Sequence, residues 1–437
     1  MQKSTKILFA TLIPTLLISN TYASEQSDAK GFVEDATGSV LFRTGLNTRD
    51  KKNGKTDQNS SGQSAIFKLD SGFTQGTIGF GVGILADGGF KIGDNAHAGT
   101  DMIPAENDGA TDQFGNVTPR DHWIRGGGYV KARISNTTLT YGTQTVNSPV
   151  FASNLGRIAP EYYEGVSITS HEIENLELTL GKYTKNVRAS QVNSDANKLD
   201  KAITWGAKYK VNDQLNASYY GLDIKDRLKR HYVNTNFTQP LNENSSLVYD
   251  FNAYHTKWDP EGNTYSETTN DKNNRSNSIW AFSTTYNIGP HSVMLAYQQN
   301  TGNTGYDYNN NADGGGSIVL PNSYLSDFAG AGEKSVNLQY SFDFGALDIP
   351  GLTWTSAYAY GWDIDVANAD RTQLITDNAK ESEFFNQIKY TVQSGFAKDV
   401  SFRARNYIYR ADAAYRDNYM PNIDEWRVFL DIPIKLF

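Results

Sequence analysis

The sequence has 437 residues, no cysteine, and a net charge of −8 from 40 basic and 48 acidic residues. The absence of cysteine excludes disulfides, thiolate metal sites and cysteine catalysis. The acidic balance argues against nucleic acid as a partner, because proteins that bind duplexes are usually basic. Aromatic residues make up 12% of a chain in which only 38% of residues are hydrophobic, which is unusual for a protein built around a soluble core.

The first 23 residues have the pattern of an export signal. Lys3 and Lys6 form a basic start, residues 7–18 are apolar, and 21–23 (Thr-Tyr-Ala) form a small-x-small cleavage site before Ser24. The alternative is a permanent membrane anchor, but the apolar run is short for crossing a bilayer. We therefore expect cleavage near Ala23 and export. Loss of the two lysines changes the net charge from −8 to −10.

The rest of the chain is dominated by alternation of apolar and polar residues. It has no segment approaching the roughly 18 consecutive apolar residues of a transmembrane helix. Period-two alternation is clear over 203–211, 335–344, 352–362 and 426–435, and aromatic side chains are frequent on the apolar face. Such strands occur in a soluble sandwich or barrel, and in a membrane barrel whose apolar face points outward.

The connections between the strands favour the membrane barrel. Long polar stretches alternate with short turns along the chain, as in outer-membrane barrels with long external loops and short periplasmic turns. The long stretches are 48–64, 88–121, 146–164, 185–201, 223–230, 258–277, 300–334, 363–382 and 410–423. The short turns are 71–76, 135–137, 171–175, 211–214, 238–245, 287–291, 345–351 and 394–399. These connections predict an all-β, 18-stranded antiparallel transmembrane barrel formed by one domain, 24–437, with both termini in the periplasm.

Several cations share the polar face of the expected strands. A charge on the lipid face would cost about 2–4 kcal/mol at mid-bilayer, so these side chains should face the lumen. The first, seventeenth and eighteenth strands adjoin where the barrel closes, which would make one basic wall. The residues concerned are Arg43, Arg49, Arg125, Lys131, Arg133, Arg403, Arg405 and Arg427.

Two interpretations of these cations remain open. They could pair with lumen carboxylates such as Asp70, Asp343 and Asp431 and stiffen the barrel. Alternatively, they could form a ladder of weak bidentate contacts that passes an anionic solute along the channel. We favour the ladder because the protein is acidic overall, so local enrichment of cations is not a consequence of composition.

A barrel of this size leaves an aqueous channel, so selectivity requires a segment folded into it. The third and seventh long loops are the candidates. The side chains that we expect at a constriction are Arg157, Tyr162, Asp313, Ser323, Tyr324 and Asp327.

Short runs throughout the mature chain resemble the outer-membrane porin D (OprD) family. The matching runs are 31–35, 41–43, 47–50, 73–81, 89–91, 131–137, 141–143, 157–160, 164–165, 322–328, 332–335 and 349–353. The resemblance implies an 18-stranded, substrate-selective channel for passive diffusion of small water-soluble solutes. These solutes typically bear a carboxylate, which includes amino acids, aromatic or other organic acids, and some antibiotics.

The resemblance also implies roles for particular residues. Arg403, Arg405 and Arg427 occupy positions that match the family's basic ladder in the closing strands. Loops three and seven match the segments that form the family's constriction, where acidic and hydroxyl groups face the arginines. The tip of loop seven, 309–316, departs from the family because asparagine and glycine dominate it.

Other function classes have weaker support. The sequence lacks the H-E-x-x-H, G-x-S-x-G and G-x-x-x-x-G-K-[ST] motifs, and its six histidines are scattered. An outer-membrane serine protease or esterase stays open as the alternative, since triad residues need not be sequence neighbours. A plugged, energy-coupled transporter would need a longer chain. We therefore expect a channel in a Gram-negative outer membrane rather than an enzyme, with no cofactor or metal, contacting lipid and solutes, as a monomer or weak homotrimer.

Overall fold

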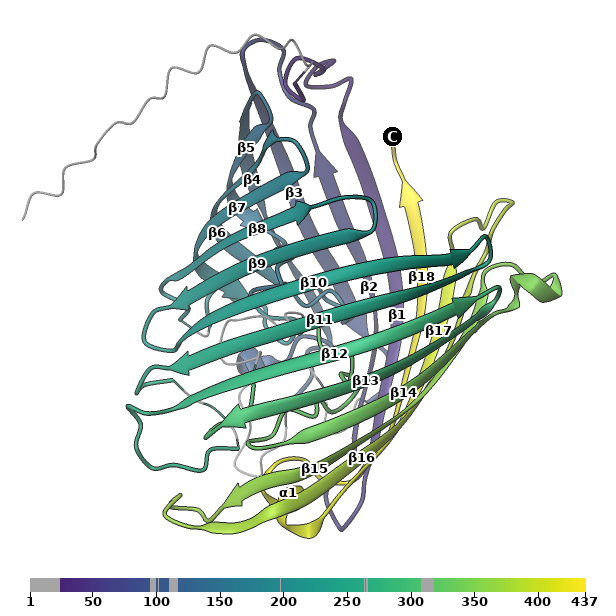
Figure 1. The fold of residues 1–437 in the computed structure, drawn as a ribbon. Coiled ribbons are helices and arrows are strands. Elements are labelled where there is room, and N and C mark those ends of the chain that lie inside the picture. Colours follow the sequence, from purple (N-terminus) through teal and green to yellow (C-terminus); the bar gives the residue numbers. More distant parts are fainter. Residues whose placement is uncertain are drawn as a thin grey trace, which may run out of the picture.

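Antiparallel strands make up nearly all the regular structure of the protein (Figure 1). The computed structural model describes residues 24–94, 100, 102–109, 117–196, 198–262, 264, 266–307 and 318–437. The expected export signal, 1–23, and Asp313 lie outside the described residues. None of the helices within the described part is long or apolar enough to cross a membrane.

Eighteen strands follow one another along the chain. They are β1 (Thr37–Lys51), β2 (Gln58–Asp70), β3 (Ile78–Lys91), β4 (His122–Ile134), β5 (Thr137–Gln144), β6 (Tyr162–Ile173), β7 (Leu176–Val187), β8 (Ala202–Lys210), β9 (Leu215–Ile224), β10 (Leu228–Asn242), β11 (Ser245–Trp258), β12 (Ser276–Ile288), β13 (His291–Gly302), β14 (Lys334–Asp343), β15 (Leu352–Ala367), β16 (Leu374–Thr391), β17 (Ser401–Ala411) and β18 (Ile423–Lys435). The described helices are short: η1 (Glu106–Gly109), η2 (Phe344–Leu347) and α1 (Ala413–Asn418).

Each strand pairs with its neighbours in sequence, and β18 pairs with β1 to close the barrel. The closing register runs from Ser39 opposite Lys435 to Lys51 opposite Ile423. The predicted count of eighteen strands and the predicted closure are therefore confirmed. Closure leaves no unpaired strand edge, which is the condition for a sheet to reside in lipid.

The distribution of polarity is the reverse of that in a soluble protein. In β3, Phe80 and Val82 on the outer face are 59% and 46% exposed, whereas the alternate residues are buried. The buried set contains many charged and amide side chains, including Glu333, Glu425 and Arg230 at 0% exposure. An apolar outer face and a polar interior are the properties of a membrane-spanning barrel.

Some connections are shorter than the sequence suggested. The strands extend into the predicted loops 48–64, 223–230 and 363–382, leaving connections of 52–57, 225–227 and 368–373. Beyond the bilayer both faces of a strand meet water, so the alternation fades while the hydrogen-bond ladder continues. Composition alone therefore overestimates the loop lengths.

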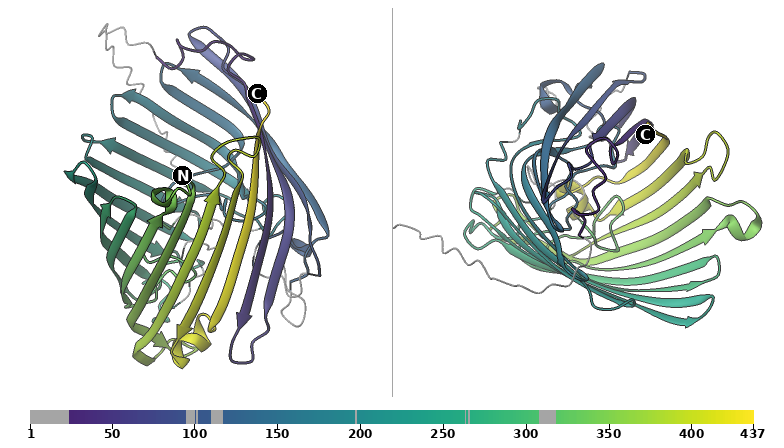
Figure 2. Two further views of the ribbon diagram at one scale, coloured as in Figure 1. Left: turned by 90° about the vertical axis from the view of Figure 1, so that its right-hand side faces the viewer. Right: turned by 90° about the horizontal axis from the view of Figure 1, so that it is seen from above.

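Two long connections fold into the barrel interior, which is occupied by chain in the view from above (Figure 2). They are L3, residues 145–161, and L7, whose described residues are 303–307 and 318–333. A buried apolar cluster joins them to the wall formed by β6–β12. Its members include Phe151 of L3, Tyr306 and Leu320 of L7, and Tyr254 of β11.

Tyr254 connects the two loops directly. Its hydroxyl donates to the Pro149 carbonyl at 3.1 Å and accepts from the Val319 amide at 3.2 Å. Its ring contacts Tyr306 with centroids 5.0 Å apart. L3 and L7 thus pack against the lumen face of β6–β12.

Candidate functional site

Arginines from three neighbouring strands converge on the wall that faces L3 and L7. The strand register places Arg405 opposite Arg427, Arg403 opposite Phe429, and Asp431 opposite Arg43. Period-two alternation of β17 directs Arg403 and Arg405 inward while Phe402 faces outward and is 43% exposed. We call Arg43, Arg49, Arg403, Arg405 and Arg427 the basic wall.

Three arginines of the basic wall are paired with two buried or half-buried carboxylates. Arg43 forms a bidentate pair with Asp431, with N···O distances of 2.8 and 3.0 Å. Arg49 and Arg427 both pair with Glu425, whose side chain is fully buried. Arg43 also donates to the Leu155 and Arg157 carbonyls at 2.8 Å each, so it ties L3 to β1.

The other two arginines have no carboxylate partner among the described residues. Arg405 Nε donates to Gln387 Oε1 at 2.7 Å, which is a bond to a neutral group. The Arg403 guanidinium lies 5.1 Å from the centroid of the Phe429 ring, and its Nε has no hydrogen-bond partner. Arg403 and Arg405 therefore present uncompensated positive charge to the lumen.

Arg125 occupies a different environment from the basic wall. Its side chain is 2% exposed and pairs with Asp87 at 3.1 Å. It also donates to the carbonyls of Arg188, Gln191 and Pro160. Through these contacts the buried Arg125 side chain links β3 and β4 to two loops, and it has no access to the channel.

Lys131 and Arg133 lie nearer the short-turn end of β4. Lys131 binds Asp70 at 2.7 Å, and Arg133 lies 3.6 Å from Glu25. Both stand over the ring of Phe73, at 4.4 and 4.1 Å. A lumen pocket of about 310 Å³ extends from here along β2–β5 and is lined by Lys68, Asp70, Phe73, Leu85, Tyr129, Lys131, Thr138, Thr140, Gln144 and Thr145.

The predicted L3 residues have structural contacts. The backbone carbonyl of Arg157 accepts from Arg43. Tyr162, the first residue of β6, is only 3% exposed and packs against the Arg125 guanidinium at 5.5 Å. Tyr162 is thus part of the packing behind L3 and does not line the lumen.

The described L7 residues of the predicted set lie together and are half-buried. Ser323 donates to Asp327 within the loop. The Tyr324 hydroxyl donates to Gln339 at 2.9 Å and accepts from Asn337 at 2.8 Å. Its ring stacks on Phe385 with centroids 4.6 Å apart, which places this part of L7 against β14 and β16.

Buried carboxyl groups hold L7 from behind. Glu383 accepts from the amides of Leu325 and Ser326 at 2.9 and 2.8 Å, and Glu381 accepts from Ser326 Oγ at 2.9 Å. Glu333, in L7 itself, accepts from the Gly330 amide at 2.7 Å. All three side chains are buried, and the salt bridges within the described residues involve none of them.

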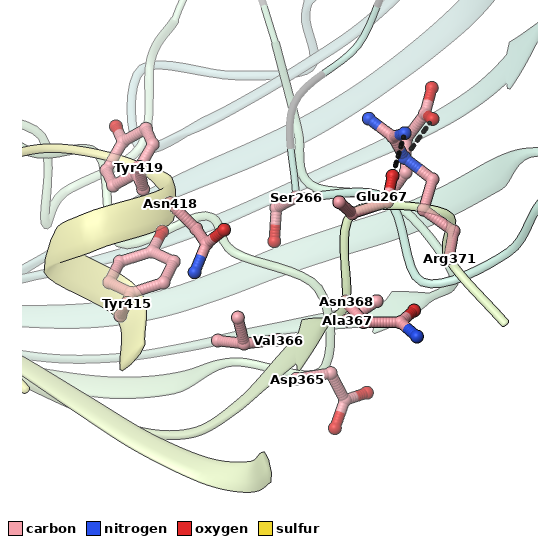
Figure 3. Close-up of a pocket in the computed structure, with 11 residues that line it drawn as sticks. Ser266, Glu267, Asp365, Val366, Ala367, Asn368, Arg371, Tyr415, Asn418 and Tyr419 are labelled. Carbon is pink, nitrogen blue, oxygen red and sulfur yellow. Dashed lines mark hydrogen bonds and ion pairs between the residues drawn. The ribbon is translucent and has the colours of Figure 1, made fainter. Parts of the chain in front are cut away.

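A second, smaller pocket of about 110 Å³ lies at the long-loop end of β15 (Figure 3). Glu267 at its edge pairs with Arg371 at 2.8 Å, and Tyr415 and Tyr419 of the α1 region form the opposite side. Ser266 of this pocket accepts from the Ala331 amide of L7 at 3.0 Å. The pocket contains none of the predicted site residues.

Sequence reasoning missed four residues that shape the lumen: Glu381, Glu383, Tyr254 and Phe429. Only Phe429 carries a usable signal, because it is an aromatic residue between Arg427 and Asp431 on the inward face of the last strand. The roles of the other three depend on loops that fold back against strands distant in sequence.

Comparison with known proteins identifies the family. Residues 30–436 match the model of the OprD family of outer-membrane porins. The chain is 35% identical over 440 residues to Porin D of Pseudomonas aeruginosa, covering 96% of this chain and 95% of that protein.

Solved structures agree with the sequence comparison. The crystal structure of OccAB1 of Acinetobacter baumannii is 59% identical with a TM-score of 0.89, over 95% of this chain and all of that one. The OprD structure of Pseudomonas aeruginosa is 32% identical with a TM-score of 0.76, over 96% of this chain and all of that one. The chain therefore belongs to the OprD family of outer-membrane porins, substrate-specific channels of the Gram-negative outer membrane that are not enzymes.

Proposed function

We propose that this porin passes small carboxylate-bearing solutes, such as amino acids and other organic acids, along its basic wall. The observation that carries the proposal is the pair Arg403 and Arg405, which face the lumen with no carboxylate partner in the described part of the chain. A guanidinium binds a carboxylate through two parallel hydrogen bonds, and in water such a contact is weak enough to release it.

The paired arginines have a supporting role in this proposal. Arg43, Arg49 and Arg427 are already paired with Asp431 and Glu425, so they shape the wall, and Arg43 also holds L3. An anion that leaves Arg405 would meet Arg403 two residues along the same face of β17. We propose that Asp327 and Tyr324 of L7 supply hydrogen-bonding groups for the other end of the solute.

The double substitution Arg403→Gln/Arg405→Gln tests the proposal in planar bilayers. Glutamine retains hydrogen-bonding capacity but removes the charge that attracts an anion. We expect a shift of reversal potential toward cation selectivity and at least a fivefold weaker block of the current by small carboxylates. Arg410→Gln on the same strand is the matched control, because Arg410 pairs with Asp424 outside the basic wall.

The double variant could assemble normally and still show the ion selectivity and the carboxylate block of the parent. That result would show that the basic wall has no role in solute passage. Neutral sugars serve as the comparison solute, since they should be insensitive to the charge change. Impaired assembly with unchanged selectivity in the assembled fraction would support a purely structural role.

We also propose that the mature protein begins at Ser24, after removal of 1–23. The segment from Ser24 onward is anchored in the barrel: the Gln26 amide donates to the Ser135 carbonyl at 3.1 Å and its side chain donates to the Thr74 carbonyl at 3.0 Å. N-terminal sequencing of the exported protein checks the cleavage position.

A further inference from the structure

One aromatic ring lies against two arginines of the basic wall. Phe429 is on the lumen face of β18 and is 2% exposed. The Arg43 and Arg403 guanidinium carbons are 5.6 and 5.1 Å from the centroid of its ring. Both distances are within the range of cation–π attraction.

The ring packs in a buried apolar cluster with residues from three elements. The other members are Met102 and Ile103 of the β3–β4 connection, Trp123 of β4, and Ile158 and Ala159 of L3. Gly45 of β1 permits the approach, since a Cβ there would be 2.8 Å from Ile158 Cγ1 and 3.0 Å from Phe429 Cε1. Phe429 is therefore a fixed support, clamped between L3 and the wall.

The two arginines differ in what else they contact. Arg43 is held by Asp431 and two carbonyl oxygens, so it would keep its position without the ring. Arg403 has no carboxylate partner within the described residues, and Phe429 is the contact that orients its guanidinium. A carboxylate in place of the ring would orient Arg403 as well, but it would cancel the charge. An aromatic ring attracts a cation through its quadrupole and carries no net charge.

We propose that Phe429 is a positioning residue for solute recognition: it orients the Arg403 guanidinium toward the lumen and leaves its charge available to the solute carboxylate. A long, flexible arginine side chain otherwise loses conformational freedom when it binds an anion, and prior orientation reduces that cost. The inference rests on the proposed carboxylate function, and it assigns to Phe429 an effect on affinity that is separate from charge.

The test compares Phe429→Leu with Arg403→Gln in planar bilayers, with acetate and glutamate as probes. Leucine retains apolar packing but removes the ring. Because Phe429→Leu changes no charge, the reversal potential in a salt gradient should equal that of the parent. Carboxylate block should weaken by about three- to tenfold, the loss expected for one cation–π contact.

Four further variants make the result decisive. Phe429→Tyr retains a ring and should restore the parent block, whereas Phe429→Met, a flexible apolar side chain without a ring, should behave like leucine. In the Arg403→Gln background, Phe429→Leu should cause no further loss, because the ring acts through Arg403. Phe402→Leu, on the lipid face beside Arg403, is the matched control and should behave as the parent.

The outcomes separate the two proposals. If Arg403→Gln weakens carboxylate block and Phe429→Leu does not, the positioning role is wrong and the carboxylate function stands. If neither variant affects block, both fail. A shifted reversal potential in Phe429→Leu, or equal losses from Phe429→Leu with and without Arg403, would also overturn the positioning role.

Discussion

At the scale of single residues, the basic wall contains two kinds of arginine that the sequence does not distinguish. Alternation along β1, β17 and β18 sends all five side chains inward, yet only Arg403 and Arg405 lack a carboxylate partner among the described residues. Arg49 and Arg427 share the single carboxylate of Glu425, which the β1–β18 register places opposite Arg49. The lumen field therefore depends on where the carboxylates stand as much as on the number of cations.

Glu425→Gln should destabilise the barrel and increase its anion selectivity. The substitution leaves two half-buried guanidinium groups without their counter-ion, and removal of one partner from a buried pair costs about 3–5 kcal/mol. We expect a lower thermal unfolding temperature and a reversal potential shifted toward anions. Asp424→Asn is the control: Asp424 is about one-third exposed and pairs with Lys52 and Arg410, so its loss should cost under about 1 kcal/mol. Equal effects of the two substitutions would contradict the account.

At the scale of elements, L7 is a loop held in the lumen by buried acids. Glu381 and Glu383 of β16 accept from the L7 residues Leu325 and Ser326, and Glu333 accepts from Gly330. The Glu333 carboxyl also interacts with that of Glu381. Two buried carboxyls in contact cannot both ionise at low cost, so the anchoring of L7 depends on a proton.

Glu333 makes L7 sensitive to alkaline pH. Burial, and secondarily the neighbouring Glu381, raises the pKa of Glu333 well above its usual value. The anchored loop therefore favours the protonated carboxyl, and the stability of the anchor is lost as pH rises through the raised pKa. We expect single-channel conductance to increase, with more frequent fluctuations, in a titration from pH 6 to 10.

The variant Glu333→Gln should remove this pH response, because the amide cannot ionise. Glu243→Gln, in an exposed short turn, is the matched control and should retain the parent response. A parent conductance that stays constant from pH 6 to 10, or a Glu333→Gln channel that still responds, would refute the proton-dependent anchor.

At the scale of the whole molecule, the parts of the structure that follow from local patterns could be predicted. Strand count and closure follow from the regular succession of strands, long loops and short turns, and the inward direction of Arg403, Arg405 and Arg427 follows from alternation within single strands. Whether a loop then covers an inward side chain is a non-local property. Arg125 has the alternation expected of a channel-lining residue, yet L3 and its neighbours bury it. The same reason explains why the sequence did not predict that Tyr254 bridges L3 and L7, or that Glu381 and Glu383 bind L7.

Because the number of strands is even, both chain ends lie at the same rim of the barrel. The identity of that rim can be tested in intact cells. The N-terminal segment binds the short turns through Gln26, and the Leu436 amide donates to the Gly38 carbonyl at 2.9 Å, so both ends lie at the short-turn rim. An epitope inserted between 369 and 370, in the β15–β16 connection at the opposite rim, should bind antibody on intact cells. The same epitope between 395 and 396, in the short turn before β17, should bind only after the outer membrane is permeabilised. Because both sites are exposed turns, insertion should leave the barrel assembled in each case, and the reverse labelling pattern would invert the proposed orientation.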